Sequence, residues 1–206
     1  MKLSTKIAAV LALSAPLFVF AQEPVQETAP VKEEPKTLAL VAVGQIDEQM
    51  VERVRKFAED NIFFPVRILP ARELFGNGLD NEGREAARSM DPRDVGLVAL
   101  VMTEEDIPSH GVFLPKERVA VVNAKVIQPN PANDELYFKR LRKGTMRGYG
   151  LLLGMETCPN PQCCMAGYTT LEQLDSIGNN FCPPCYGKVE AACSAAGLKM
   201  LEFPTE

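Results

Sequence analysis

The chain has 206 residues, a formal net charge of −5, and six cysteines but only one histidine. The acidic balance argues against a nucleic-acid partner, which would require a basic surface. The single histidine excludes a metal site built from three imidazoles. The length suits one domain with a sizeable hydrophobic core.

Residues 1–21 have the pattern of a secretory signal peptide. Two lysines precede an almost wholly apolar run at 7–20, and Val19 and Ala21 supply the small residues that a signal peptidase needs before the cut. The run is shorter than the ~20 residues that span a bilayer, although an uncleaved anchor is the alternative. We therefore expect cleavage after Ala21, export to the periplasm or the extracellular medium, and no membrane partner after cleavage.

The next stretch, residues 22–36, is rich in proline and glutamate and has no large apolar side chain except valine. Such a segment cannot bury enough apolar surface to offset the entropy lost on ordering, so we predict a disordered tether. From residue 37 the pattern becomes globular, and we assign residues 37–206 to one domain.

Strands and helices alternate through the first part of this domain. Nearly continuous apolar runs predict buried strands, at 37–44, 64–69 and 95–103. A helix after the N-cap candidate Asp47 would bury apolar residues at helical spacing, namely Met50, Val51, Val54, Phe57 and Ala58. A weaker helix is predicted at 81–90, and an edge hairpin from 112–115 and 118–126. This order predicts an α/β fold, either a sandwich or a doubly wound sheet.

A long helix is expected from Asn133 or Asp134 to about Met155. Four glycines interrupt it: Gly144, Gly148, Gly150 and Gly154. Each interior glycine costs about 1 kcal/mol relative to alanine, so packing alone would rarely select four. Either they allow the close approach of a neighbouring segment, or they replace residues that were lost. We interpret the basic run at 139–143 on this helix as a solvated face.

Four of the cysteines form two close pairs. Cys158 and Cys163 are spaced C-x4-C, Cys182 and Cys185 are spaced C-x2-C, and prolines stiffen both loops. Two such chelating loops suit a tetrahedral structural zinc with four thiolate ligands. Two alternatives stay open. The thiols could form disulfides in an oxidising compartment, or the second pair, before a helix predicted at 188–197, could be redox-active.

Three further residues are not expected to bind metal. Cys164 and Cys193 lie outside the four-ligand set, and we expect either a disulfide between them or two buried free thiols. His110 is interpreted as a loop residue beside a solvated acidic run, whose charges would raise its pKa.

The stretch RGYGLLLGMETCPNPQCCM at 147–165, with CPPC at 182–185, resembles the archaemetzincin family of metzincin-like zinc metalloproteases. The resemblance extends from about residue 37 to 193. Metzincins carry H-E-x-x-H-x-x-G-x-x-H on a helix and its exit turn, followed by a methionine turn. In archaemetzincins a cysteine follows the third histidine, and four cysteines hold a second zinc. The resemblance implies a metzincin-like sandwich with a mixed sheet, a long motif-bearing helix and a four-cysteine zinc knuckle at 158–185.

Aligned on this motif, the chain lacks the catalytic residues. The motif positions, in chain order, hold Arg147, Gly148, Leu151, Gly154, Thr157 and Met165. The histidine positions thus carry arginine, leucine and threonine. Arginine is a permanent cation, leucine has no donor atom, and threonine is a poor metal ligand. Glycine stands where the general-base glutamate should be. Without ligands and base no zinc-bound water is activated, so we expect no catalytic zinc and no peptidase activity.

These observations leave two classes of function. The first is an exported, non-catalytic scaffold or peptide- or protein-binding protein that holds one structural zinc. The resemblance implies that the segment from 110 to 126 forms the upper wall of its cleft, along which an extended ligand would add a strand. The second class is an enzyme, either a residual zinc metallopeptidase or a thiol-disulfide oxidoreductase that uses Cys182 and Cys185.

Overall fold

The computed structural model of the chain describes residues 34–202. The predicted signal peptide and most of the predicted tether lie outside the described residues. Within the described range, no helix is both long enough and apolar enough to span a membrane.

Five strands form one mixed sheet in the order β2-β1-β3-β5-β4. Their bounds are β1 Thr37–Val43, β2 Val66–Ile68, β3 Asp94–Val101, β4 Gly111–Leu114 and β5 Val119–Asn123. Neighbouring strands from β2 to β5 are parallel, and β4 pairs antiparallel with β5 at the edge. The predicted buried strands and the predicted edge hairpin are therefore present, with the second strand shortened to three residues.

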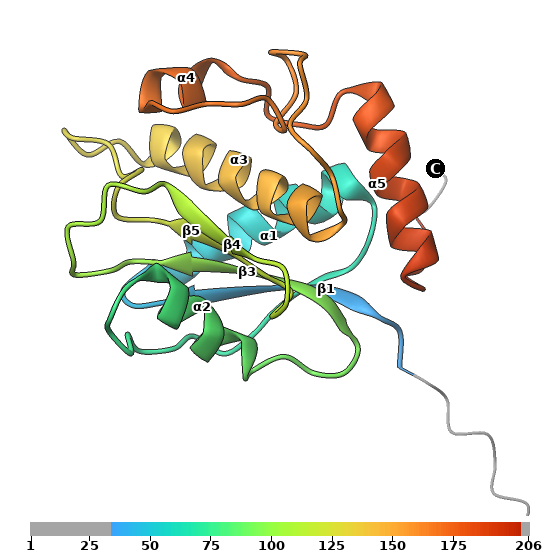
Figure 1. Cartoon of the computed structure of the whole chain (residues 1–206), viewed down its shortest axis with the longest axis horizontal. Coiled ribbons are helices and arrows are strands. Elements are labelled where there is room, and N and C mark those ends of the chain that lie inside the picture. Colours follow the sequence, from blue (N-terminus) through green and yellow to red (C-terminus); the bar gives the residue numbers. More distant parts are fainter. Residues whose placement is uncertain (1–33, 203–206) are drawn as a thin grey trace, which may run out of the picture. The chain divides into compact units, whose positions relative to one another are not determined.

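Helices cover both faces of the sheet (Figure 1). Their bounds are α1 Glu48–Ile62, α2 Leu79–Ala87, α3 Asp134–Leu152, α4 Leu171–Ser176 and α5 Pro183–Ala195. Successive residues of a strand point to opposite faces. Leu38 and Leu40 accordingly pack in the core with α1 and α3, whereas Ala39 and Val41 pack in the core with α2. Burial on both faces explains why β1 and β3 are almost wholly apolar.

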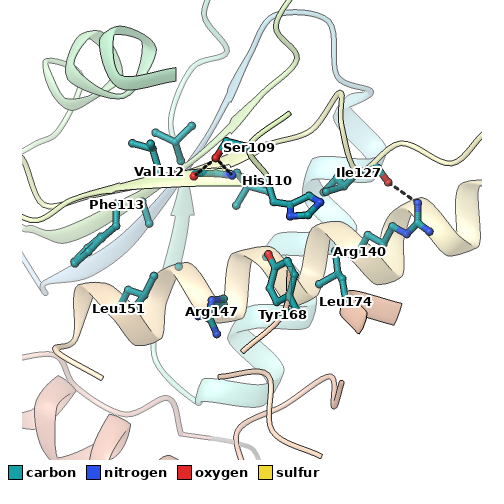
Figure 2. Close-up of a pocket in the computed structure, with 16 residues that line it drawn as sticks. Ser109, His110, Val112, Phe113, Ile127, Arg140, Arg147, Leu151, Tyr168 and Leu174 are labelled. Atoms are coloured by element: carbon teal, nitrogen blue, oxygen red, sulfur yellow. Dashed lines mark hydrogen bonds between the residues drawn. The ribbon is translucent and has the colours of Figure 1, made fainter. Parts of the chain in front are cut away.

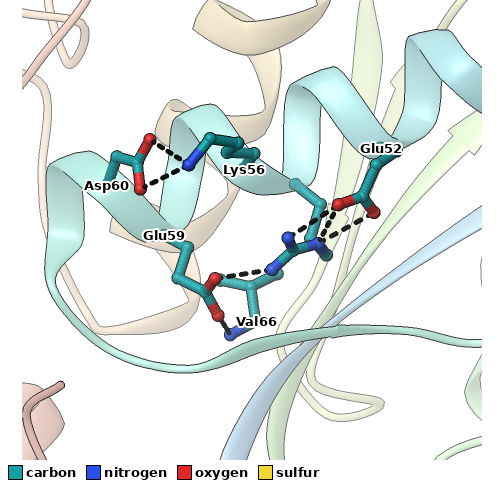
Figure 3. Close-up of polar contacts among 6 residues, drawn as sticks. Glu52, Lys56, Glu59, Asp60 and Val66 are labelled. Atoms are coloured by element: carbon teal, nitrogen blue, oxygen red, sulfur yellow. Dashed lines mark hydrogen bonds and ion pairs between the residues drawn. The ribbon is translucent and has the colours of Figure 1, made fainter.

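Helix α1 begins and is anchored as its sequence predicts. The Asp47 carboxylate accepts a hydrogen bond from the Met50 N–H at 2.8 Å. At the other end, the Glu59 carboxylate accepts from the Arg55 guanidinium at 2.6 Å and from the Val66 N–H at 3.0 Å (Figure 3). Glu59 therefore joins α1 to the first residue of the edge strand β2.

Two helices differ from the prediction. Helix α5 begins at Pro183, five residues before the predicted start. Prolines lack an N–H, but they are tolerated in the first turn of a helix, where that N–H has no partner within the helix. Helix α4 is not predicted at all, since six residues are too few to show helical periodicity. Its start is fixed by Thr170, whose hydroxyl accepts from the Gln173 N–H at 3.3 Å.

Candidate functional site

The glycines of α3 allow neighbouring segments to approach the helix closely. A Cβ atom at Gly144 would lie 2.9 Å from Val122 Cγ1 of β5, and one at Gly148 would lie 2.9 Å from Val98 Cγ2 of β3. A Cβ atom at Gly150 would overlap the sulfur atom of Met165. The glycines that face the sheet and the methionine turn therefore fit the first of the two explanations, close packing.

The last of the four glycines ends the helix. Gly154 has φ +79°, a left-handed conformation that favours glycine and reverses the chain after α3. The turn leads to Cys158, whose N–H donates to the Met165 carbonyl at 2.9 Å. The backbone turn expected of the motif is thus present although its ligands are not.

A cavity of about 300 Å³ lies between α3 and the hairpin β4–β5 (Figure 2). Arg147, Gly148 and Leu151 line it from α3. Thr157 lies outside it, exposed beyond the end of the helix, whereas Met165 is fully buried. The structure therefore brings the first three motif positions to one cavity and leaves the third histidine position out of it.

Arg147 connects the long helix to the methionine turn. Its Nη1 donates to the carbonyl oxygens of Met165 at 3.0 Å and Ala166 at 2.9 Å. A guanidinium has no lone pair to offer a metal. At the first ligand position the chain therefore has a cation that holds the turn in place, and these residues do not fit a catalytic zinc.

His110 lies at the other wall of the cavity. Its ring centroid is 5.4 Å from that of Tyr168, which follows the methionine turn. Burial and the nearby charge of Arg140 lower the pKa of His110 below 6.5, not above it as the acidic run predicts. One imidazole cannot replace a three-ligand site, and within residues 34–202 the four cysteines are the one group with three or more potential metal ligands.

The paired cysteines meet in one cluster. The Sγ atoms of Cys158, Cys163, Cys182 and Cys185 all lie within 4.8 Å of one another. The distance from Cys158 Sγ to Cys182 Sγ is 3.8 Å, and tetrahedral zinc with bonds of about 2.3 Å places its sulfurs about 3.8 Å apart. The donor set and its spacing therefore fit a structural zinc with four thiolate ligands.

Backbone N–H groups favour thiolates in the cluster, although burial raises the pKa of the Cys163 and Cys185 thiols. The Cys185 N–H, at the start of α5, lowers the pKa of the Cys182 thiol to about 7. The Cys182 N–H donates to Cys163 Sγ at 3.4 Å. A low thiol pKa is also a property of redox-active pairs. Here, however, the two sulfurs of the C-x2-C pair face two further thiols, which is the arrangement of a metal site.

Cys164 and Cys193 are fully buried free thiols. Burial raises the pKa of both thiols, that of Cys193 to about 12. Neither belongs to the four-sulfur cluster. Of the two states predicted for this pair, the structure has the unpaired one.

The interpretation of the basic run at 139–143 as a solvated face is wrong for two of its members. Arg140 and Lys143 are only 7% and 5% exposed. Arg140 donates to the Asp175 carboxylate at 2.8 and 2.6 Å, and Lys143 Nζ donates to the Leu174 and Asp175 carbonyls at 2.9 and 2.7 Å. These residues fasten α4 over α3, and because α4 is not predicted, its partners could not be predicted either.

Comparisons with known proteins relate this chain to one peptidase family. The sequence model of peptidase family M54 matches residues 109–191. The archaemetzincin of Thermococcus kodakarensis is 34% identical over 180 residues, which cover 75% of this chain and 95% of that protein.

Solved structures are similar in fold. The archaemetzincin of Methanopyrus kandleri has a TM-score of 0.64 and 21% identity, and the match covers 81% of this chain and 99% of the other. A zinc-dependent peptidase from Methanocorpusculum labreanum has a TM-score of 0.61 and 20% identity, covering 74% and 99%.

Proposed function

The chain belongs to the archaemetzincin family of zinc metallopeptidases, and we propose that it is a non-catalytic member that binds peptides or proteins and holds one structural zinc. The observation that carries this proposal is the position of Arg147, whose guanidinium is hydrogen-bonded to the methionine turn where the first zinc ligand should stand.

Catalysis is lost at each step that it requires. A catalytic zinc needs three donor side chains and an open position for water, and the cavity receives arginine and leucine from the ligand positions. A general base at position 148 would have to displace Val98, since even a Cβ atom there would lie 2.9 Å from it. A restored glutamate would therefore disturb the packing of α3 on the sheet.

The cleft retains the feature that would bind an extended peptide. Strand β4 is at the edge of the sheet, and its free backbone groups can pair with an added strand. Phe113 of β4 is 39% exposed at this edge and lines the cavity. Loss of the metal removes the reaction but leaves the wall against which a peptide would lie.

The structural zinc would join two segments that are distant in the sequence. Cys158 and Cys163 follow α3, whereas Cys182 and Cys185 lie at the start of α5. One ion with four thiolate ligands would tie both segments together and contribute directly to folding. Three of the four cysteines are buried, which would protect the thiolates outside the cytoplasm.

We also propose export, with cleavage after Ala21, supported by the basic and apolar pattern of residues 1–21. The protein would then act in the periplasm or the extracellular medium.

The test combines metal content with activity on the native protein. Native mass spectrometry should find one zinc per chain, and a fluorogenic peptide library should remain intact with and without a zinc chelator. Chelator-sensitive cleavage together with a second metal ion would contradict the proposal. A metal-free protein with two disulfides would contradict the structural zinc and favour a disulfide-linked fold. A metal-free protein that reduces or oxidises disulfides would favour the thiol-disulfide oxidoreductase that uses Cys182 and Cys185.

A further inference from the structure

The cavity between α3 and β4 is positively charged, although the chain as a whole is acidic. Its lining includes Arg140, Arg147 and His110, and no carboxylate side chain. Arg140 is neutralised by its ion pair with Asp175 at 2.6 Å. The net positive charge of the cavity therefore comes from Arg147, in a chain whose formal charge is −5.

Arg147 keeps three of its five donors for a ligand. A guanidinium has five N–H groups, and the two on Nη1 are used on backbone carbonyls. Among the described residues, neither Nε nor Nη2 makes a hydrogen bond, and Arg147 has no ion pair. The Nε–Nη2 side of a guanidinium is a planar fork that matches the two oxygens of a carboxylate.

Tyr168 adds a polar group to the same cavity. The Arg147 guanidinium lies 5.5 Å from the centre of the Tyr168 ring. Figure 2 shows the hydroxyl of that tyrosine directed toward His110 and the hairpin. An anion held by Arg147 would therefore share the cavity with a hydroxyl donor.

The hydrogen-bonding pattern of β4 limits how far a peptide can extend along the edge. The Asn123 N–H donates to the His110 carbonyl at 2.9 Å, so these two residues form a bonded pair. Alternation in an antiparallel ladder then turns the N–H and C=O groups of Gly111 and Phe113 to the free edge.

One of these two positions is already occupied. The Ser109 hydroxyl donates to the Gly111 carbonyl at 2.8 Å and accepts from the Gly111 N–H at 3.4 Å (Figure 2). An added strand can thus exchange hydrogen bonds with Phe113 but not with Gly111. A peptide that pairs with β4 at Phe113 therefore meets the Ser109 hydroxyl at the next pairing position, beside the cavity.

We propose that the cleft binds the C-terminal carboxylate of an extended peptide, with the Nε–Nη2 fork of Arg147 as the anion-binding group. The free position at Phe113 pairs with the peptide backbone, and Ser109 closes the edge where the peptide ends. This inference rests on the proposed peptide-binding function. In it, the fixed positive charge of Arg147 recognises the peptide terminus in place of the catalytic metal of the family.

The test compares one probe in two chemical forms. A library of N-acetylated random pentapeptides is made as free acids and as C-terminal amides, and retention of each on the immobilised full-length protein is measured. The free acids should be retained at least about tenfold more, because a charge-assisted bidentate pair contributes that much. Arg147→Met should abolish the difference. Lys139→Met, at an exposed position of the same helix, should leave the difference unchanged.

The possible outcomes distinguish failure of the carboxylate site from failure of the proposed peptide binding. Equal retention of acids and amides by the wild-type protein would overturn the carboxylate site and leave peptide binding standing. Retention of neither form would overturn both. Equally strong retention of amidated peptides that contain aspartate or glutamate would show recognition of side chains and overturn the commitment to a terminus. The wild-type comparison decides the question even if Arg147→Met does not fold.

Discussion

At the scale of single residues, Arg147 has a structural role that follows from the chemistry of its side chain. An arginine is always charged and cannot bind zinc, but its fork can satisfy backbone carbonyls that a turn leaves exposed. Its two hydrogen bonds to Met165 and Ala166 span 18 and 19 residues of sequence. Reversion of this position alone to histidine would supply one ligand and remove both hydrogen bonds.

Gly148 offers a test of whether the packing of α3 against the sheet excludes a glutamate at this position. Gly148→Glu should destabilise the protein by about 1–3 kcal/mol, because its Cβ would be 2.9 Å from Val98 Cγ2 and 3.2 Å from Ala120 Cβ. Chemical denaturation measures the effect. Val98→Ala should relieve part of it when the two substitutions are combined. An unchanged unfolding midpoint for Gly148→Glu would show that the helix has room for a glutamate at this position.

His110 gives a pH dependence that can be observed without interference, since it is the only histidine in the chain. Burial first, and the Arg140 charge second, lower its pKa below 6.5 in the folded state. As the pH falls, the imidazole of the unfolded chain therefore binds its proton before that of the folded chain does. Protonation of His110 thus lowers the free energy of unfolding as the pH falls from 6.5 through the folded pKa. The imidazole NMR signal should titrate below 6.5; a midpoint at or above that value would contradict the prediction.

At the scale of elements, α4 depends on α3 more than on its own sequence. Arg140→Met removes the pair with Asp175, so amides of α4 should exchange hydrogen severalfold faster. Hydrogen–deuterium exchange of peptides covering 171–177 measures this. Arg142→Met is the matched control, because Arg142 stacks on Phe57 at 4.6 Å from its ring centre. Equal exchange in both variants would mean that the Arg140–Asp175 pair does not stabilise α4.

The same contrast explains how much of the fold could be predicted. Strands β1 and β3 are readable because burial on both faces demands apolar residues throughout. Helix α1 is readable from its cap and its period. Helix α4 is not, because the contacts that stabilise it come from Arg140 and Lys143, residues whose charge indicates exposure. The sequence therefore predicts elements whose own residues show a pattern of burial. It does not predict an element that is stabilised by residues distant in the sequence.

The candidate site divides in the same way. The four cysteines are predictable because chelating ligands must lie close together in short loops, and the structure brings them within 4.8 Å. The role of Arg147 is not predictable, since its partners are backbone carbonyls, which every residue has. The contact of Ser109 with the edge strand is not predictable either, because its partner is the backbone carbonyl of Gly111.

At the scale of the whole domain, the cysteine cluster lies where three segments meet. Cys158 follows the motif helix, Cys163 precedes the methionine turn, and Cys182 caps α5. The turn at Met165 is held from one side by Arg147 and from the other by the Cys158 N–H. A metal in the cluster would thus stabilise the floor of the cleft as well as the C-terminal helix.

Removal of a thiolate ligand should therefore affect the metal and the domain together. Cys182→Ser should release the zinc and lower the melting temperature by about 10 °C, because a structural ion contributes several kcal/mol to a domain of this size. Cys164→Ser is the matched control, since Cys164 is fully buried beside the cluster but is not one of its sulfurs. It should lose some stability from a buried hydroxyl and keep one zinc per chain. Metal analysis and thermal unfolding of both variants test the assignment, and loss of zinc from Cys164→Ser would show that the four-ligand set is wrong.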